Sequence, residues 1–204
     1  MLHDVNRRAS FGLLLSLALL PLLVLPGSAQ PTTDQAREMV RNVGDEVLTV
    51  LRDGSLPQAQ KFERLVGVLD GPIDLDLVAR LILGRHWRTA TEQQQQEYLT
   101  LFRAFALDTL ASRLHMYQGQ EFTVTGARVV SDKDALVTSR ILSNGRPPLD
   151  VDWRLRDVEG QLVAIDVIVA GVSLIVTQRS EFGSVVERQG VEGLLNQLRQ
   201  RVDA

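Results

Sequence analysis

The sequence predicts an α+β fold in which helices come first, an antiparallel sheet follows, and helices close the chain. Apolar residues recur at helical spacing up to about residue 119, alternate with polar residues from 120 to 170, and return to helical spacing after 171. The links between the alternating segments are only a few residues long, which indicates an antiparallel meander of four strands. We therefore expect one domain over residues 30–204, with 30–119 mainly helical, 120–170 forming the sheet and 171–204 forming C-terminal helices.

Four helices precede the sheet in this prediction. Thr33 or Asp34 can cap the first helix, because a short polar side chain accepts a hydrogen bond from an unpaired amide of the first turn. Asp74 stands in the same position before the third helix, and Thr91 begins the fourth and longest one. The expected bounds of these helices are 32–51, 58–69, 75–83 and 91–117.

The predicted strands differ in how many of their faces must be buried. In the third strand, apolar residues from Leu149 to Leu155 alternate with charged residues such as Arg154, so one face lies in water and the other faces helices or a cavity. The fourth strand is apolar on both faces and must be covered on both. Protein core can form one covering layer, and a ligand can form the other. The expected strands are 122–130, 135–142, 149–158 and 162–170.

The turn after the fourth strand is predicted at Gly171, and Ser173 is expected to cap the helix that follows. On this helix, we expect Arg179 to pair with Asp166 and to fasten the helix to the sheet, while a phosphate contact is the alternative role for Arg179. Gly190 is expected to separate this helix from a last one.

The first 29 residues have the layout of a secretory signal peptide. A basic segment with Arg7 and Arg8 precedes an apolar run over 11–25 and a small-residue site that ends at Ala29. We predict cleavage after Ala29, by either the general or the twin-arginine export route. An uncleaved membrane anchor is the alternative, but the run contains Pro21 and is short for a spanning helix.

The composition excludes several classes of protein. Because the chain has no cysteine, it has no lipid-modified cysteine, disulfide or thiolate metal site. The predicted signal peptide contains Arg7, Arg8 and Asp4, so 20 basic and 24 acidic residues remain after its removal. This acidic balance argues against nucleic acid as the main partner.

No catalytic set or cofactor motif assembles from the sequence. His86 and His115 lie in different predicted elements, with no partner at metal-ligand spacing. Ser173 lacks the second glycine of a nucleophile elbow. Asp74 and Asp76 stand at a helix start, where capping is the simpler role and a hard cation the alternative. We therefore expect neither enzymatic activity, nor a cofactor, nor a metal.

Two sequence blocks carry a family resemblance. The segment DVIVAGVSLIVTQRSEF, residues 166–182, and a block formed by Leu83, Gly84, Arg85, Trp87, Arg88, Thr91 and Gln94 resemble the MlaC family, also called the toluene-tolerance family, of periplasmic phospholipid-binding proteins. The two blocks stand in the order expected of that family.

The resemblance implies a nuclear-transport-factor-like curved sheet packed by helices around an apolar cavity. It also implies a soluble, monomeric periplasmic carrier that takes the acyl chains of a phospholipid and leaves the head group near solvent. The implied partners are an outer-membrane lipoprotein complex and an inner-membrane ABC transporter with an MCE-domain subunit, between which such a carrier maintains outer-membrane lipid asymmetry.

The apolar residues of the predicted core elements are the candidates for lipid contact, although plain core packing would use the same residue types. These candidates are Leu81, Ile82, Trp87, Phe102, Leu110, Val137, Ile141, Val151, Trp153, Val167, Val169, Val172 and Leu174. Arg85 and Arg88 are candidates for head-group contact, because guanidinium groups match phosphate geometry.

Three alternatives to a phospholipid carrier stay open at this stage. The cargo of such a cavity can be a hopanoid-like isoprenoid lipid. An enzyme would place two titratable side chains together in the cavity. An adaptor that binds only proteins would have a filled core and an exposed apolar patch instead.

Overall fold

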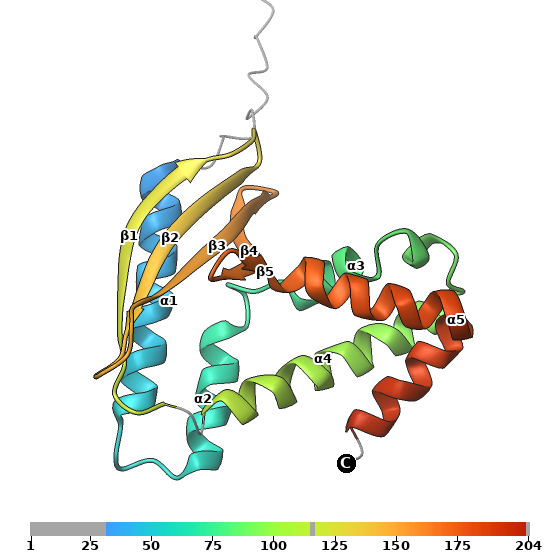
Figure 1. Cartoon of the computed structure of the whole chain (residues 1–204), viewed down its shortest axis with the longest axis horizontal. Coiled ribbons are helices and arrows are strands. Elements are labelled where there is room, and N and C mark those ends of the chain that lie inside the picture. The colour runs from blue at the N-terminus through green and yellow to red at the C-terminus, as the bar shows by residue number, and fades with distance from the viewer. Residues whose placement is uncertain (1–31, 115–116, 203–204) are drawn as a thin grey trace, which may run out of the picture.

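The computed structural model describes residues 32–114 and 117–202, with the side chains of residues 111, 113 and 114 not described. The predicted signal peptide and His115 therefore lie outside the described residues. Within them the chain is an α+β protein, as predicted: a helical N-terminal part leads into an antiparallel sheet, and helices follow it (Figure 1). The helices are α1 (Thr33–Arg52), α2 (Gln58–Leu69), α3 (Leu75–Leu83), the 3-10 helix η1 (Gly84–Arg88), α4 (Glu92–Leu114) and α5 (Leu174–Val202).

The sheet is a meander in which each strand pairs antiparallel with the next along the chain. Two irregularities in register, between Val124 and Gly126 and between Arg154 and Leu155, interrupt the ladders, and such bulges bend strands. Four strands were predicted, but a fifth, of two residues, adds to the edge because the chain pairs once more with β4 before it becomes helical. The strands are β1 (Glu121–Val129), β2 (Asp134–Leu142), β3 (Leu149–Val158), β4 (Gln161–Val169) and β5 (Val172–Ser173).

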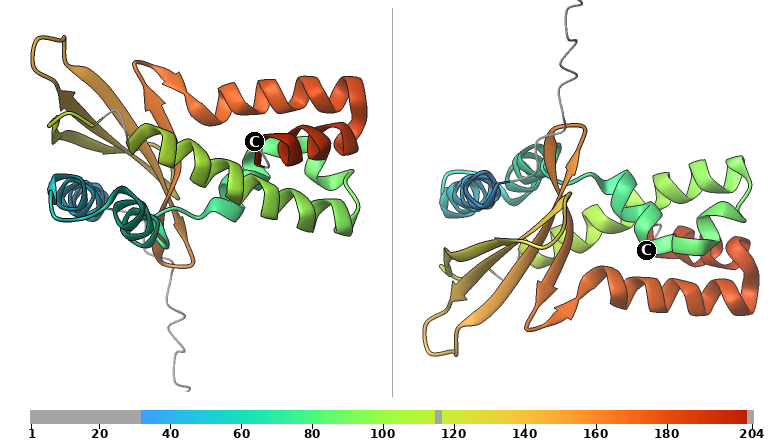
Figure 2. Two further views of the ribbon diagram at one scale, coloured as in Figure 1. Left: turned by 90° about the horizontal axis from the view of Figure 1, so that it is seen from below. Right: turned by 90° about the horizontal axis from the view of Figure 1, so that it is seen from above.

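Two main apolar clusters divide the molecule. Helix α1 covers one face of the sheet, where Ala36 and Val40 pack against Val137 and Leu155. A second cluster, built around Tyr98, joins α3, α4 and α5. Figure 2 shows these three helices grouped beyond the edge of the sheet, away from α1.

Short polar side chains start the helices close to the predicted positions. Thr32, and not Thr33 or Asp34, caps α1: its hydroxyl accepts a hydrogen bond from the amide of Gln35, and the Gln35 side chain accepts one from the Thr32 amide. This reciprocal pair satisfies two backbone donors, whereas a cap at Thr33 would place Ala36, which has no side-chain acceptor, at the reciprocal position. The Asp74 carboxylate accepts a bond of 2.8 Å from the Leu77 amide and caps α3, as predicted.

The corner between β4 and α5 differs from its prediction in one contact. Ser173 caps α5 as expected: its hydroxyl accepts a bond of 3.0 Å from the Val176 amide and donates one of 2.5 Å to Asp166. The predicted pair between Asp166 and Arg179 is absent, because Asp166 also accepts from the Ile175 amide while both donors of Arg179 reach the carbonyl oxygen of Leu81. Arg179 thus fastens α5 to α3 and not to the sheet.

Helix α5 contains the predicted break at Gly190. Its φ of 71° is in the left-handed region, so the two halves of α5 meet at a kink. In residues 32–114 and 117–202, no helix is both long and apolar enough to cross a bilayer.

Candidate functional site

An apolar cavity of about 820 Å³ lies between α1 and the sheet face that α1 covers. Helix α1 provides one wall, β1 to β4 provide the opposite wall, and residues of α2, the α2–α3 link and α4 close it. The volume is within the range of about 300–1,000 Å³ that is usual for small-molecule sites. The lining residues are Met39, Val40, Val43, Gly44, Val47, Leu48, Leu51, Leu69, Pro72, Ile73, Leu110, Tyr117, Gln120, Glu121, Phe122, Ile141, Ser143, Arg146, Pro147, Leu149, Trp153, Leu155 and Ala164.

The α1 wall follows from the helical spacing of its apolar residues. Val40, Val43, Val47 and Leu51 recur every three or four residues and therefore share one face of the helix. This face is directed at the cavity and not at a filled core, because all four residues line the empty space. Val43, Val47 and Leu51 are half-buried and Val40 is buried, as expected of side chains beside an open cavity.

On the sheet wall, Trp153 presents an apolar ring to the cavity. Its indole nitrogen donates a hydrogen bond of 2.9 Å to the hydroxyl of Ser139, which in turn donates one of 2.8 Å to the carbonyl oxygen of Val151. The ring of Phe122 meets the Trp153 ring edge to face, with 6.3 Å between centroids. Since these internal bonds satisfy the polar atoms of the wall, the cavity surface here is hydrocarbon.

The polar residues of the lining gather at one end of the cavity. They come from the segment before β1, from the start of β1, and from the β2–β3 connection: Tyr117, Gln120, Glu121, Ser143 and Arg146. The pairing of Glu121 with Leu142 brings these two segments together. Arg52, at the end of α1, donates a hydrogen bond of 3.2 Å to the Tyr117 hydroxyl. The cavity therefore has a polar rim and an apolar interior.

A smaller hollow of about 140 Å³ extends the apolar region between α2, α3 and α4. Leu69, Ile73 and Leu110 line both this hollow and the main cavity, so they form the partition between the two. Its apolar side chains continue the hydrocarbon surface toward the helical part of the molecule.

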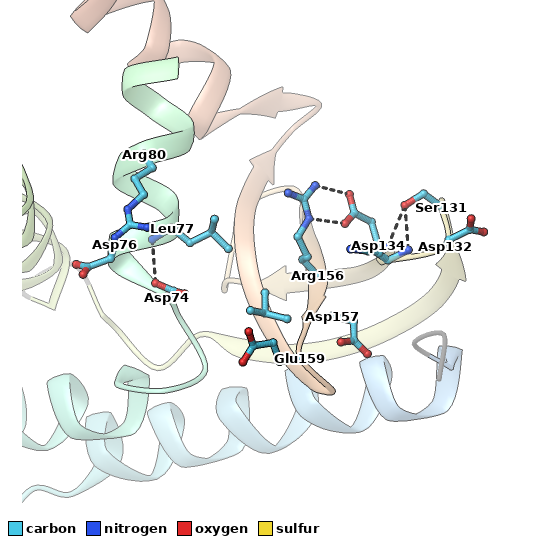
Figure 3. Close-up of a pocket in the computed structure, with 12 residues that line it drawn as sticks. Asp74, Asp76, Leu77, Arg80, Ser131, Asp132, Asp134, Arg156, Asp157 and Glu159 are labelled. Atoms are coloured by element: carbon cyan, nitrogen blue, oxygen red, sulfur yellow. Dashed lines mark hydrogen bonds and ion pairs between the residues drawn. The ribbon is translucent and has the colours of Figure 1, made fainter. Parts of the chain in front are cut away.

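A separate polar cleft of about 910 Å³ lies where α3 meets the β1–β2 and β3–β4 turns (Figure 3). Several of its charged groups hold the fold together. Asp134, which is 2% exposed, receives hydrogen bonds from both Arg154 and Arg156 at 2.6–3.0 Å. The hydrogen bond from Arg156, together with that from Arg154, keeps the pKa of Asp134 below its usual value despite the burial. Among the described residues, no group of three or more His, Asp or Glu side chains is arranged to hold a metal.

Three of the thirteen residues predicted to contact lipid line the cavity: Leu110, Ile141 and Trp153. Leu81, Ile82, Trp87 and Phe102 belong instead to the cluster of α3, α4 and α5, because these three helices pack on one another and form their own core. Val137 and Val151 are buried on the sheet face beside Trp153, and Val167 and Val169 are half-buried on β4. Val172 and Leu174 are more than half exposed at the corner between β4 and α5.

The two predicted head-group arginines lie on η1, in the helical part, and neither lines the apolar cavity. Arg85 pairs with Glu187, and Arg88 is exposed. The prediction missed the contribution of α1 and of Arg146. The apolar stripe of α1 was visible in the sequence, but the same stripe is expected of a helix packed on a filled core.

Comparison with known proteins agrees with the family resemblance of the sequence and extends it over most of the chain. The family model described as MlaC protein matches residues 41–200. The toluene tolerance protein ttg2D of Pseudomonas putida is 27% identical over 185 residues, which is 88% of this chain and 83% of that protein. The intermembrane phospholipid transport system binding protein MlaC of Haemophilus influenzae is 20% identical over 132 residues, 63% of this chain and 62% of that protein.

A solved structure, the phospholipid-binding protein from Ralstonia solanacearum in complex with a phospholipid, superposes with a TM-score of 0.71 at 25% identity. The superposition covers 82% of this chain and 97% of that one. Since the family model spans well over half of the sequence and the arrangement of helices and sheet agrees, the chain belongs to the MlaC family.

Proposed function

We propose that this protein is a phospholipid carrier that holds acyl chains in the cavity between α1 and the sheet. The observation that carries the proposal is the cavity itself, which is apolar inside and has its polar residues at one end. A filled-core adaptor would not contain such a space. The charged residues of its lining, Glu121 and Arg146, both stand at the rim. The interior therefore offers hydrocarbon contact and lacks the pair of titratable groups that an enzyme would place there.

The energetics of a carrier suit this lining. Burying a methylene group is worth about 0.8 kcal/mol relative to water, so two acyl chains of roughly thirty methylenes favour the cavity over water by on the order of 20 kcal/mol. A bilayer offers the chains the same apolar surroundings, so transfer between protein and membrane is nearly balanced. Contacts with partners can then set the direction of transfer.

The proposal includes the place of action. The signal peptide directs the carrier to the periplasm and is cleaved there. The carrier then moves phospholipid between an outer-membrane lipoprotein complex and an inner-membrane ABC transporter with an MCE-domain subunit. The family and the name of the Haemophilus influenzae relative, an intermembrane phospholipid transport system binding protein, support this assignment. The form of the protein recovered from the periplasm is expected to begin at Gln30, which N-terminal sequencing checks.

The two tryptophans provide a direct test, because Trp153 lines the cavity and Trp87 packs in the helical cluster. Protein is loaded with phospholipid whose acyl chains carry bromine, which quenches only a tryptophan in contact with it. In the Trp87→Phe variant the remaining Trp153 should lose most of its fluorescence on loading. In the Trp153→Phe variant the remaining Trp87 should be unaffected.

Native mass spectrometry of protein purified from the periplasm of its host completes the test. We expect phospholipid to co-purify with the protein, and lipid-free protein to extract it from liposomes. A protein that is lipid-free from its host, extracts nothing and shows no quenching of Trp153 would overturn the proposal.

A further inference from the structure

Arg146 is held at the rim of the cavity by the geometry of the β2–β3 connection. Its amide donates a hydrogen bond of 3.2 Å to the carbonyl oxygen of Ser143, and Gly145 has a φ of 73°, which closes a tight turn. Pro147 and Pro148 follow and restrict the backbone on the other side. The position of Arg146 is therefore fixed by its own loop, and its side chain lines the cavity.

Among residues 32–114 and 117–202, no side chain forms an ion pair with the guanidinium of Arg146. In the described part of the chain, eight other arginines lie within ion-pair distance of a carboxylate, whereas Arg146 does not. A second guanidinium, that of Arg52, is held near the same rim by its bond to the Tyr117 hydroxyl. Positive charge that lines an apolar cavity without a partner carboxylate is suited to an anionic group on an otherwise apolar ligand.

We infer that Arg146 binds the phosphate of the cargo at the cavity rim, with Arg52 and the Tyr117 hydroxyl as further contacts. The inference rests on the proposed function, because it takes the acyl chains to lie in the cavity interior. The planar donors of a guanidinium match two phosphate oxygens at once. Arg146 thus selects lipids that carry a phosphate head group over neutral lipids with the same chains, such as diacylglycerol or an isoprenoid alcohol.

A competition experiment tests the selection. Lipid-free protein is offered equal amounts of phosphatidylglycerol, phosphatidylethanolamine and diacylglycerol, all with oleoyl chains, and native mass spectrometry gives the ratio of bound phospholipid to bound diacylglycerol. We expect wild type to favour phospholipid and Arg146→Gln to lower the ratio about tenfold, since hydrogen bonds to a charged group are lost. Arg88→Gln, which removes an exposed arginine away from the cavity, should leave the ratio unchanged.

The outcomes of this competition distinguish a wrong head-group assignment from a wrong carrier function. If Arg146→Gln matches wild type while both bind phospholipid, the inference is wrong and the carrier function stands. If Arg88→Gln lowers the ratio and Arg146→Gln does not, the head group lies at η1 instead. Retained diacylglycerol in Arg146→Gln shows that the cavity is intact, and failure of wild type to bind any of the three lipids contradicts the proposed function itself.

A titration with inorganic phosphate tests the alternative that Arg146 binds a free anion, because the same guanidinium chemistry fits both ligands. Calorimetric titration of lipid-free protein with inorganic phosphate should show no Arg146-dependent binding, because the acyl chains supply the affinity. Saturable binding of phosphate that Arg146→Gln abolishes would instead identify an ion site and overturn the assignment to a lipid head group.

Discussion

Gly44 of α1 lies directly against the ring of Phe122 on β1: a β-carbon at Gly44 would stand less than 3.0 Å from two ring atoms of Phe122, closer than real side chains approach. Both residues line the cavity. The absence of a side chain at Gly44 lets α1 approach β1 at this point, and the same Phe122 ring packs nearly perpendicular to the Trp153 ring. The distance between α1 and the sheet, and hence the shape of the cavity, depends on this contact.

Gly44→Ala should therefore remove both stability and cargo space. The added methyl group pushes the Phe122 ring toward the cavity, and overpacking of this kind costs about 1–3 kcal/mol. This cost offsets the gain of up to about 1 kcal/mol that alanine brings to a helix interior. Urea unfolding should show a variant no more stable than wild type, and native mass spectrometry should show less bound phospholipid.

Gly67→Ala is the matched control for Gly44→Ala. Gly67 is an exposed helical glycine of α2 with nothing within 4 Å of its added β-carbon. This variant should gain a few tenths to about 1 kcal/mol and keep its lipid. Equal stabilisation by the two substitutions would show that Phe122 yields freely and that the contact does not shape the cavity.

Asp134→Asn should destabilise the sheet, because Arg154 and Arg156 lose their negatively charged partner. The buried carboxylate is bonded by Arg154 and Arg156, and loss of its charge weakens both contacts. We expect the free energy of unfolding to fall by about 2 kcal/mol at pH 7, since each bond to a charged group is worth more than a neutral one. Asp150→Asn, which weakens an exposed pair with Arg140, should cost under about 1 kcal/mol.

The effect of Asp134→Asn should also depend on pH in a defined direction. The arginines lower the pKa of folded Asp134 below its ordinary value of 3.8. A carboxylate with a lowered folded pKa contributes stability that is present above the unfolded pKa and is lost as pH falls through the folded pKa. Urea unfolding should therefore show the gap between wild type and variant shrinking below about pH 4. A gap that stays constant with pH would exclude this origin.

Local signals in the sequence predicted most of the fold. Strands β1 to β4 lie within one residue of their predicted bounds, and α2 and α3 lie at theirs, because periodicity, turn residues and caps act over a few residues. The contact of Arg179 was predicted wrongly for the opposite reason. Its partner, Leu81, is 98 residues away, and Asp166 is already bonded by residues of its own corner.

The cavity lining could not be predicted in the same way. A stripe such as Val40, Val43 and Val47 looks alike whether it faces a filled core or an empty space. The difference arises from how closely α1 approaches the sheet at Gly44, which is a tertiary contact. Trp87 and Trp153 illustrate the outcome, since both were predicted to contact lipid and the structure places one in a filled helical core and the other on the cavity.

The capped corner after β4 should behave as one unit. Ser173→Ala removes the acceptor for the Val176 amide, and loss of a cap of this kind costs about 1 kcal/mol. Asp166→Ala removes the partner of Ser173 and of the Ile175 amide. Because the two residues share a hydrogen bond, the double variant should lose at least about 0.5 kcal/mol less than the sum of the single losses. Thr177→Ala is the control, because the Thr177 hydroxyl donates to the Ser173 carbonyl oxygen and not to the Ser173 side chain or to Asp166. Its loss should add to that of Asp166→Ala. Strict additivity of Ser173→Ala and Asp166→Ala would contradict the coupling.

Tyr98 should make the helical part of the protein sensitive to alkali. Its side chain is 0% exposed, and its hydroxyl donates a bond of 3.0 Å to the carbonyl oxygen of Ala79. Burial raises the pKa of Tyr98 far above its ordinary value of 10.0. A group whose folded pKa is raised contributes stability that is fully present below the unfolded pKa and is lost as pH rises toward the folded pKa.

At pH 7, Tyr98→Phe should lower the free energy of unfolding by about 1 kcal/mol, because the hydrogen bond to Ala79 is lost. Above about pH 10 wild type should lose stability faster than the variant, so the gap should close. Urea unfolding at several pH values measures this gap in stability between wild type and variant.

In a Tyr117→Phe background Tyr98 is the only tyrosine, so its ionisation is followed by absorbance. Tyr98 should ionise only as the protein unfolds. Ionisation near pH 10 in a protein that stays folded would show that Tyr98 is accessible to water and would contradict its place in the core.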